Sequence, residues 1–259
     1  MRRLLALLAL YLLAGAPWAA AAEPVLVTDI SQHRIELRQG FTGAQLLLFG
    51  AIMSPDGGGP VAGAARDYDV VVVLEGPAHQ MVLREKRKVA GMWVNAEYTT
   101  LRSVPSFYAV VANRPIRQIT DPRTAAIYQL GLDSLQLSPS DSIDPARETH
   151  FAKGLVDLMQ RQGLFHQDDS GVTINGGVLY SARIDLPSSV QPGVYTAETF
   201  AVRKGRVVAS ATARVEVGKQ GFEKAVADFS QKEALAYGLM AVAVSVVMGW
   251  VAGRLFALF

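Results

Sequence analysis

The chain alternates apolar and polar positions along much of its length, and it carries one continuous apolar segment at each end. From Val207 to Val217 every second residue is apolar, and Val178 to Leu186 repeats this alternation. A period of two is typical of strands that turn one face to a core and the other to water. Two runs lack it, Gln45 to Ile52 and Asp69 to Leu74, and these predict central strands covered on both sides.

Short β-prone segments separated by Gly and Pro turns fill much of the remaining middle region. Further strands are predicted at Val25–Ile30, Arg34–Arg38, Met81–Val89, Met92–Thr99 and Phe107–Ala112. Turns are predicted at Asn175-Gly176, Pro192-Gly193 and Lys204-Gly205. The pattern favours a mainly β fold, an antiparallel immunoglobulin-like sandwich, and leaves open whether it forms one module or two.

Residues 119–165 change to a helical pattern. Asp121-Pro122 and Asp144-Pro145 each combine an N-cap acceptor with a proline in the first turn. One apolar stripe at helical spacing follows, before a stop at Gly163: Phe151, Leu155, Leu158 and Met159. We predict a short helical insert at 119–165, between an N-terminal β part at 23–118 and a C-terminal β part at 166–218.

The N-terminal apolar segment has the layout of a secretory signal peptide. Arg2 and Arg3 precede the apolar run Leu4–Leu13, and Ala20-Ala21-Ala22 fits the small-residue cleavage pattern. An uncleaved membrane anchor is the alternative, but the strongly apolar core is short for hydrocarbon about 30 Å thick. We therefore predict a cleaved signal peptide at 1–22.

Residues 234–253 carry no charge and predict a transmembrane helix over 234–254. Twenty residues rising about 1.5 Å each match a hydrocarbon core of about 30 Å. Tyr237 and Trp250 lie near the two expected interfaces. An amphipathic juxtamembrane helix is predicted at 219–233 and a cytoplasmic tail at 255–259. With a cleaved signal peptide, this predicts a single-pass protein of the bacterial inner membrane with its main domain in the periplasm.

Charge and composition exclude several functions. The formal net charge is +2, and losing Arg2 and Arg3 brings it to zero, so nucleic acid is not an expected partner. The chain has no Cys, which excludes disulfides and Cys-based metal or nucleophile sites. The four His residues show no metal-binding spacing, and no nucleophile motif is present. We expect no catalytic activity, no cofactor and no metal.

A basic cluster and an aromatic group define the candidate surface. Arg84, Lys86, Arg87 and Lys88 share one predicted strand, where they either attract anions or keep an edge strand solvated. The aromatic residues near Asn95 either fill the core or form a partner surface: Trp93, Tyr98, Phe107 and Tyr108. The candidate partner or ligand surface consists of Arg84, Lys86, Trp93, Asn95, Phe107 and Tyr108.

Small residues recur at every fourth position of the predicted membrane helix: Ala241, Ser245, Gly249 and Gly253. Such a stripe lets a second helix approach closely, so that dispersion contacts accumulate. Because small residues are common throughout this segment, chance spacing is the alternative. We predict a helix-packing interface here, either with a multipass membrane protein or with a second copy of the chain.

Several motifs resemble an uncharacterised family of alphaproteobacterial transmembrane proteins. They are Phe41-Thr-Gly43, Phe49-Gly50, Asp69-Val-Val-Val-Val-Leu-Glu-Gly-Pro77, Gly91-Met-Trp-Val-Asn95 and Val104-Pro-Ser-Phe-Tyr-Ala-Val110, together with the C-terminal span. The resemblance implies no activity and no catalytic residues. It implies a partner, because family members tend to be encoded beside sulfite/organosulfonate-type anion permeases.

Two functions remain open on this basis, and a third, an envelope hydrolase or metalloenzyme, would require polar side chains that converge in a pocket. The first is a membrane-anchored periplasmic accessory protein without catalytic activity, which partners a multipass inner-membrane anion permease through the small-residue stripe. The second is a periplasmic module that binds small oxyanions or organosulfonates through Arg84 or Lys86.

Overall fold

The computed structural model describes residues 24–38, 40–54, 59, 67–140, 144–176, 178–219, 226 and 229–256. The fold is mainly β, as predicted. The strands are β1 (Val25–Ile30), β2 (Arg34–Leu37), β3 (Gly43–Met53), β4 (Asp69–Glu75), β5 (Ala78–Val89), β6 (Met92–Pro105), β7 (Tyr108–Ala112), β8 (Phe165–Asp168), β9 (Val172–Asn175), β10 (Leu179–Pro187), β11 (Gly193–Arg203) and β12 (Arg206–Lys219).

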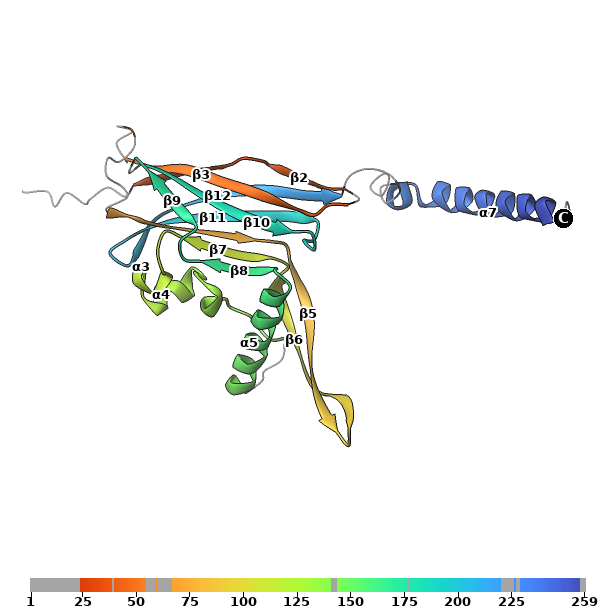
Figure 1. Ribbon diagram of the computed structural model, residues 1–259, viewed down its shortest axis with the longest axis horizontal. Helices are drawn as coiled ribbons and strands as arrows, with labels where there is room; N and C mark the ends of the chain where they lie inside the picture. Colours follow the sequence, from red (N-terminus) through yellow and green to blue (C-terminus); the bar gives the residue numbers. More distant parts are fainter. Residues whose placement is uncertain are drawn as a thin grey trace, which may run out of the picture.

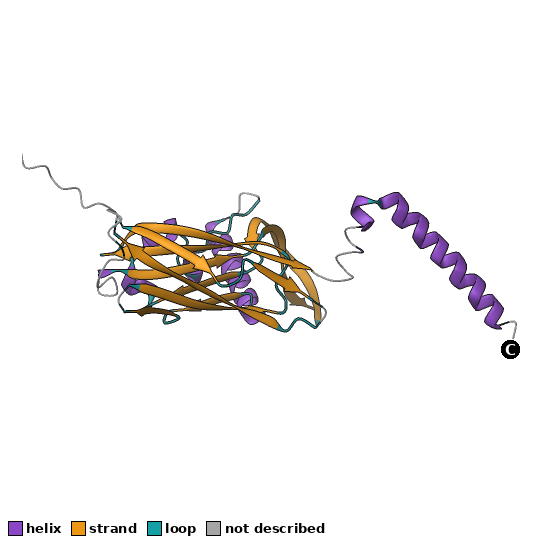
Figure 2. Ribbon diagram, turned by 90° about the horizontal axis from the view of Figure 1, so that it is seen from above, coloured by secondary structure: helices purple, strands orange, loops and turns teal. Residues whose placement is uncertain are grey.

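The strands form one sandwich and one separate ribbon (Figures 1 and 2). Sheet A has the order β1-β3-β10-β9, sheet B the order β2-β12-β11-β4-β7-β8, and the ribbon pairs β5 with β6. The pairing is mainly antiparallel, as predicted, and two edge pairs, β2–β12 and β7–β8, are parallel. β8 follows β7 only after the helical insert, a crossover long enough for parallel pairing. This strand order does not confirm the immunoglobulin-like connectivity.

The centre of sheet B is buried on both faces, at strands β4 and β7. In β4, Val70, Val72 and Leu74 contribute to the core between the two sheets. The alternate residues, Val71 and Val73, contribute to a second core on the other face. This explains the continuous apolar run in the sequence and confirms the prediction of a central strand covered on both sides.

Sheet A is covered on one face only, and this corrects the prediction for β3. Leu46, Leu48 and Ile52 are buried, but Phe49 on the other face is 41% exposed. The apolar run Gln45–Ile52 is therefore a half-buried strand whose outer positions happen to be apolar. The sequence shows no period-two alternation here because the exposed positions also carry apolar residues, and no second layer covers them.

Helices cover the second face of sheet B, beneath β7 and β8 in Figure 1. They are α3 (Ile116–Ile119), α4 (Pro122–Ile127), the 3-10 helix η1 (Leu132–Ser134) and α5 (Pro145–Arg161). The predicted N-caps are present: Thr124 N–H donates to the Asp121 carboxylate at 2.8 Å, and Asp144 caps α5. The insert differs slightly from the predicted 119–165, because α3 begins earlier and Phe165 already belongs to β8.

The apolar stripe of α5 packs on this second core. Phe151, Leu155 and Met159 are buried as predicted. Leu158 is 45% exposed, which corrects its assignment to the buried stripe. At helical spacing, Leu158 lies beside the stripe, at the edge that faces the ribbon.

Tyr108 ties the loop after α4 to this core. Its hydroxyl donates to the Gln129 carbonyl and accepts from the Gly131 N–H at 3.2 Å. Gln129 has a positive φ of 51°, an uncommon conformation for a residue other than Gly. Burial raises the pKa of the Tyr108 hydroxyl, which stays protonated and holds both partners.

The predicted transmembrane segment forms one continuous helix, α7 (Ala234–Phe256), which is long and apolar enough to cross a membrane. Its apolar stretch Ala234–Arg254 is 21 residues long, and none of these residues is buried by the part of the chain that the structure describes. The predicted signal peptide at 1–22 lies outside the described residues. Most of the predicted juxtamembrane helix at 219–233 and of the tail at 255–259 lies outside them too.

Glu75 ends β4 in a partly buried position, and this generates a pH-dependent prediction. Burial raises the pKa of its carboxyl group, and nearby Glu198 raises it further. Because the carboxyl pKa is higher in the folded chain than in the unfolded chain, ionisation of Glu75 destabilises the fold. The free energy of unfolding therefore falls as the pH rises from the unfolded pKa of about 4.3 through the folded pKa. Glu75→Gln should therefore increase the free energy of unfolding at pH 7, on the order of 0.5–1 kcal/mol.

The measurement is urea unfolding of the detergent-solubilised chain at pH 7 and near pH 4. Near pH 4 both chains are largely neutral at this position, so the gain should shrink toward zero. Glu216→Gln is a control, because Glu216 is exposed and pairs with Arg34. A gain of equal size at both pH values would contradict the electrostatic explanation.

Candidate functional site

The ribbon β5–β6 stands away from the sandwich as an arm, residues 78–105 (Figure 1). A two-residue turn closes it, with positive φ at both Ala90 (48°) and Gly91 (86°). This conformation matches the right-handed twist of the strands. Twelve residues of β5 at about 3.3 Å each give an arm about 40 Å long.

Cross-strand pairs divide the arm into two faces, because directly opposite residues in an antiparallel pair point to the same side. We call the side away from α5 the outer face. It consists of three pairs toward the tip: Arg84 opposite Tyr98, Lys86 opposite Asn95, and Lys88 opposite Trp93. Each pair thus places a cation next to an aromatic ring or an amide.

All six residues of the outer face are exposed. Trp93 is 69% and Tyr98 70% exposed, which is unusual for large aromatic side chains. Within the part of the chain that the structure describes, no carboxylate pairs with Arg84, Lys86 or Lys88. The outer face is therefore a cationic and aromatic surface that the fold itself does not use.

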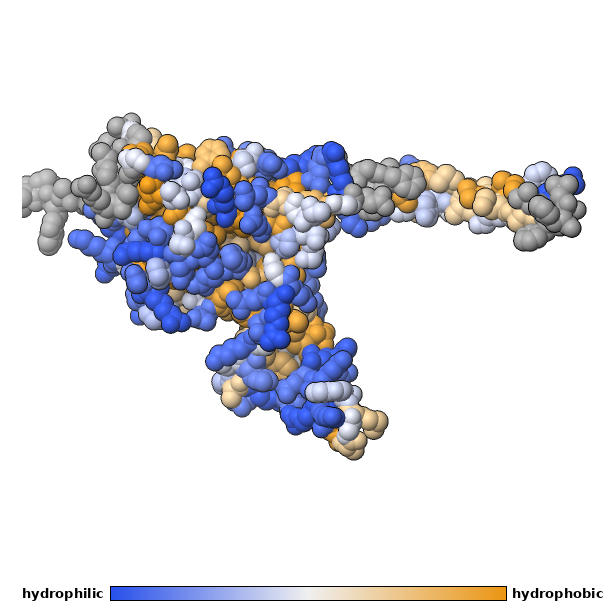
Figure 3. All heavy atoms as spheres, viewed as in Figure 1, coloured by the Kyte–Doolittle hydropathy of each residue, from blue (hydrophilic) through white to orange (hydrophobic). Residues whose placement is uncertain are grey.

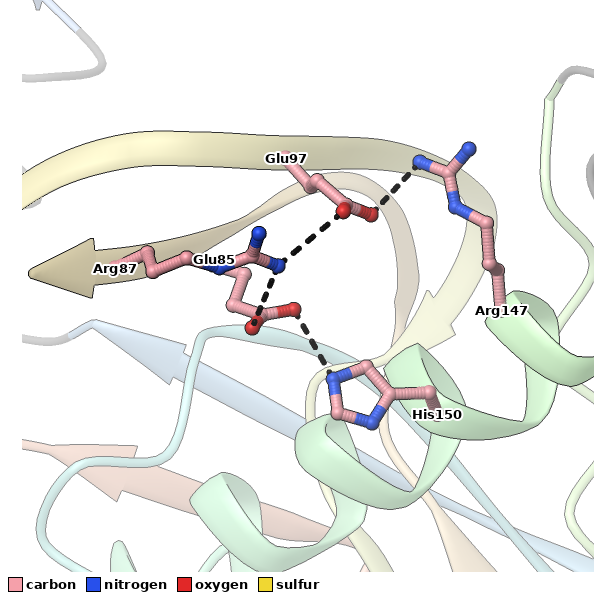
Figure 4. A network of polar contacts seen from close by, with 5 residues as sticks. All are labelled: Glu85, Arg87, Glu97, Arg147 and His150. Carbon is pink, nitrogen blue, oxygen red and sulfur yellow. Dashed lines mark hydrogen bonds and ion pairs between the residues drawn. The ribbon is translucent and has the colours of Figure 1, made fainter. Parts of the chain in front are cut away.

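The inner face of the arm packs on α5. Leu83 packs against the second core, which includes Leu155 of α5. Beyond this apolar contact lies a polar network between the two elements (Figure 4). It joins Arg87 to Glu97 at 3.4 Å and to Glu85 at 3.9 Å, Arg147 of α5 to Glu97 at 3.0 Å, and His150 of α5 to Glu85 at 3.1 Å.

The network resolves a like-charge conflict. Glu85 and Glu97 lie directly opposite each other, an arrangement that is destabilising without counter-charges. Arg87 bridges the two carboxylates, and Arg147 and His150 approach from α5. Exposed pairs of this kind contribute only about 0–1 kcal/mol each, so the network mainly aligns the arm with α5.

A β-bulge determines which face receives the acidic residue Glu97. The pairing runs in register from Val89–Met92 to Lys86–Asn95 and then shifts, so that Ala96 has no partner. Without this shift, Glu97 would lie opposite Arg84 and Tyr98 would point inward. The bulge therefore removes the carboxylate from the outer face and replaces it with an aromatic ring.

The tip of the arm carries three aliphatic side chains on its inner side and the Trp93 ring on its outer side. Val89 (52% exposed) and Met92 (67%) flank the turn, and Val94 follows one step back, on the inner side beyond the polar network with α5. Figure 3 shows this hydrophobic end beyond a hydrophilic band on the arm. The tip, the outer face and Trp93, which belongs to both, form one continuous exposed surface.

The structure brings together four of the six residues predicted for the candidate surface: Arg84, Lys86, Trp93 and Asn95. The prediction is wrong for Phe107 and Tyr108, which are fully buried. Phe107 points into the core between the sheets and Tyr108 into the second core, because consecutive strand residues alternate. Lys88 and Tyr98 also belong to this surface. The position of the turn and the bulge in the pairing place them there, and the sequence pattern alone does not indicate it.

A second candidate site, which the sequence analysis did not identify, is a polar cleft at one end of sheet B. It is lined by Asp67, Tyr68, Asp69, Asn113, Arg114, Arg203 and Lys204. Arg114 Nε donates to Asp69 at 2.6 Å, and Arg203 lies over the Tyr68 ring at 5.4 Å. The lining carries three cations and two carboxylates, a surplus of positive charge. Nothing in the local sequence signals that these segments meet.

The small-residue stripe lies on α7 as predicted. Apart from the backbone of the helix itself, a Cβ added at Gly249 or Gly253 would meet no described atom within 4 Å. The Ser245 hydroxyl donates to the Ala241 carbonyl at 2.9 Å, so it is satisfied within the helix. Among the described residues, no three or more His, Asp or Glu side chains lie close enough together to hold a metal ion.

These features define a class: a β-sandwich protein held to a membrane by one helix and carrying an exposed arm. The family comparison agrees with this class. Residues 25–257 match a family described as "Putative transmembrane protein (Alph_Pro_TM)", and the chain belongs to this family. No curated protein and no solved structure matches the chain.

The two faces of the arm should respond differently to mutation. Leu155→Ala removes buried contacts beneath the arm and should lower the free energy of unfolding by about 2–5 kcal/mol. Trp93→Ala on the outer face should change it by no more than about 0.5 kcal/mol. Urea unfolding of the detergent-solubilised chain measures both. A large loss in Trp93→Ala would mean that the ring serves the fold instead of a partner.

Proposed function

We propose that this protein is a non-enzymatic accessory protein of the bacterial inner membrane, with its sandwich in the periplasm. It assembles with a multipass membrane protein, for which an anion permease of the sulfite/organosulfonate type is the first candidate. In this proposal α7 contributes both the anchor and the contact with the partner, and the sandwich and arm act outside the bilayer.

The observation that carries the proposal is the free surface of α7. The helix is long enough to cross a bilayer, and among the described residues nothing outside the helix lies within 4 Å of a Cβ built at Gly249 or Gly253 of the stripe. Lipid tails are as apolar as the helix surface, so the hydrophobic effect does not drive helices together in a bilayer. Helices associate instead where small side chains allow close approach and tight packing. The exposed arm supports the same role, because large aromatics that the fold does not need are typical of interaction surfaces.

Gly249→Leu should disrupt this contact. A Leu side chain in the middle of the stripe holds a neighbouring helix away, so co-purification of the partner with the tagged chain from native membranes should fall by about tenfold, or roughly 1.4 kcal/mol. Quantitative mass spectrometry after mild crosslinking gives the measurement. It also identifies the partner.

Val247→Leu is the matched control, since position 247 points to the opposite side of the helix. This variant should retain the partner at the level of the unmodified chain. Equal retention in Gly249→Leu and Val247→Leu would count against the stripe. Recovery of only a second copy of the chain would show self-association instead of a permease complex.

The polar cleft favours a second candidate function, the binding of small oxyanions or organosulfonates. Arg203 and Lys204 line it without a carboxylate partner among the described residues, although Arg114 is paired with Asp69. An anion there would meet guanidinium and ammonium donors. Arg84 and Lys86, the residues that the sequence suggested, lie instead on an open strand surface.

Calorimetric titration of the full chain with sulfite, sulfate and methanesulfonate distinguishes the two locations. Binding in the cleft should be lost in Arg203→Ala and retained in Arg84→Ala. The opposite result would assign the anion to the arm. Absence of saturable heat with every anion would leave only the accessory function.

A further inference from the structure

The arm and the membrane anchor leave the sandwich at the same end. β4 and β12 are both antiparallel to β11, so they run in the same direction within sheet B. β4 ends at Glu75, three residues before the arm begins, and β12 ends at Lys219, on the way to α7. Figure 1 shows β5 and β6 starting from the end of the sandwich where β12 finishes.

This shared end keeps the arm within reach of the bilayer. Residues 220–233 separate β12 from α7, and fourteen residues extend at most about 50 Å. The arm itself is about 40 Å long. The sandwich end from which the arm projects is thus held within about 50 Å of the membrane that contains α7, a distance comparable to the length of the arm.

The chemistry of the arm matches an anionic lipid surface. The outer face carries three cations and no carboxylate, so it complements a uniform layer of negative charge. The tip adds Val89 and Met92, and Trp93 belongs to the residue type that prefers the boundary between headgroups and acyl chains. Basic residues beside exposed apolar and aromatic ones are the combination by which surface-bound segments attach to anionic lipid.

A protein partner fits these observations less well. Protein interfaces usually bury aromatic anchors in pockets, with polar groups of both signs around them. Here Lys86 and Lys88 extend a charge of one sign along an exposed strand. The apolar residues lie at the extreme end of the arm. Such a surface favours insertion of a tip over docking into a complementary site.

We propose that the arm is a second membrane attachment. Its tip inserts into the anionic leaflet on the side of the sandwich, with Trp93 at the headgroup boundary and Arg84, Lys86 and Lys88 on lipid phosphates. This fixes the orientation of the sandwich relative to the bilayer. The inference rests on the proposed placement of sandwich and anchor at one membrane, and it does not depend on the partner of α7.

Fluorescence quenching by brominated lipids tests this proposal on the full chain. The sequence has three Trp residues, and the double variant Trp18→Phe, Trp250→Phe leaves Trp93 as the only one. In phosphatidylcholine–phosphatidylglycerol vesicles with brominated acyl chains, Trp93 emission should shift to the blue and fall by about half. In vesicles without phosphatidylglycerol, or after Lys86→Glu with Lys88→Glu, quenching should be markedly weaker.

The matched control moves the single Trp to the far end of the sandwich. Leu179→Trp, with all three native Trp residues changed to Phe, places an exposed ring beside Ala51, away from the end at which β2 pairs with β12. This Trp should stay unquenched. Unquenched Trp93 in anionic vesicles, or a photo-crosslinker at position 93 that captures protein and no lipid in native membranes, would overturn the proposal.

The outcome is separable from that of the accessory function. Lys86→Glu with Lys88→Glu should retain the partner that Gly249→Leu loses, because arm and helix stripe act on different contacts. Loss of the partner in the arm variant would show that the arm binds protein and would overturn the lipid assignment.

Discussion

The structure depends on one constraint: the centre of sheet B has to be covered on both faces. β4 carries an apolar side chain at every position from Val70 to Leu74. Exposing either face of this strand to water would therefore be unfavourable. Sheet A covers one side. On the other side the helical insert and the base of the arm supply the second core, which is why helices appear within an otherwise β chain.

The arm extends away from the sandwich because the second core covers only its base. Its base lies over the core, where Leu101 and Val104 are buried, while its outer half continues past the end of α5. A two-stranded ribbon alone is only marginally stable in water. The inner face packs on α5, and the charge network holds Glu85 and Glu97. These contacts stabilise the ribbon, so the residues of the outer face are not needed for its stability.

The sequence predicted most strands, the helix caps and the membrane helix, because each depends on local pattern. It failed where a distant layer decides the environment. Phe107 and Tyr108 look like neighbours of Trp93 along the chain, but they belong to two separate cores. The bulge at Ala96 has no sequence signature, yet it decides whether Glu97 or Tyr98 faces outward. The polar cleft assembles from segments more than forty residues apart, so no motif announces it.

The common direction of β4 and β12 also gives the domain a defined polarity. Asp69 starts β4, and the turn at Lys204 joins β11 to β12, so the polar cleft lies at the pole opposite the tether. Seven residues of β4 alone separate the two poles by about 20 Å. With the tethered pole held at the bilayer, as proposed, the cleft at the other pole faces away from the lipid, toward the aqueous compartment.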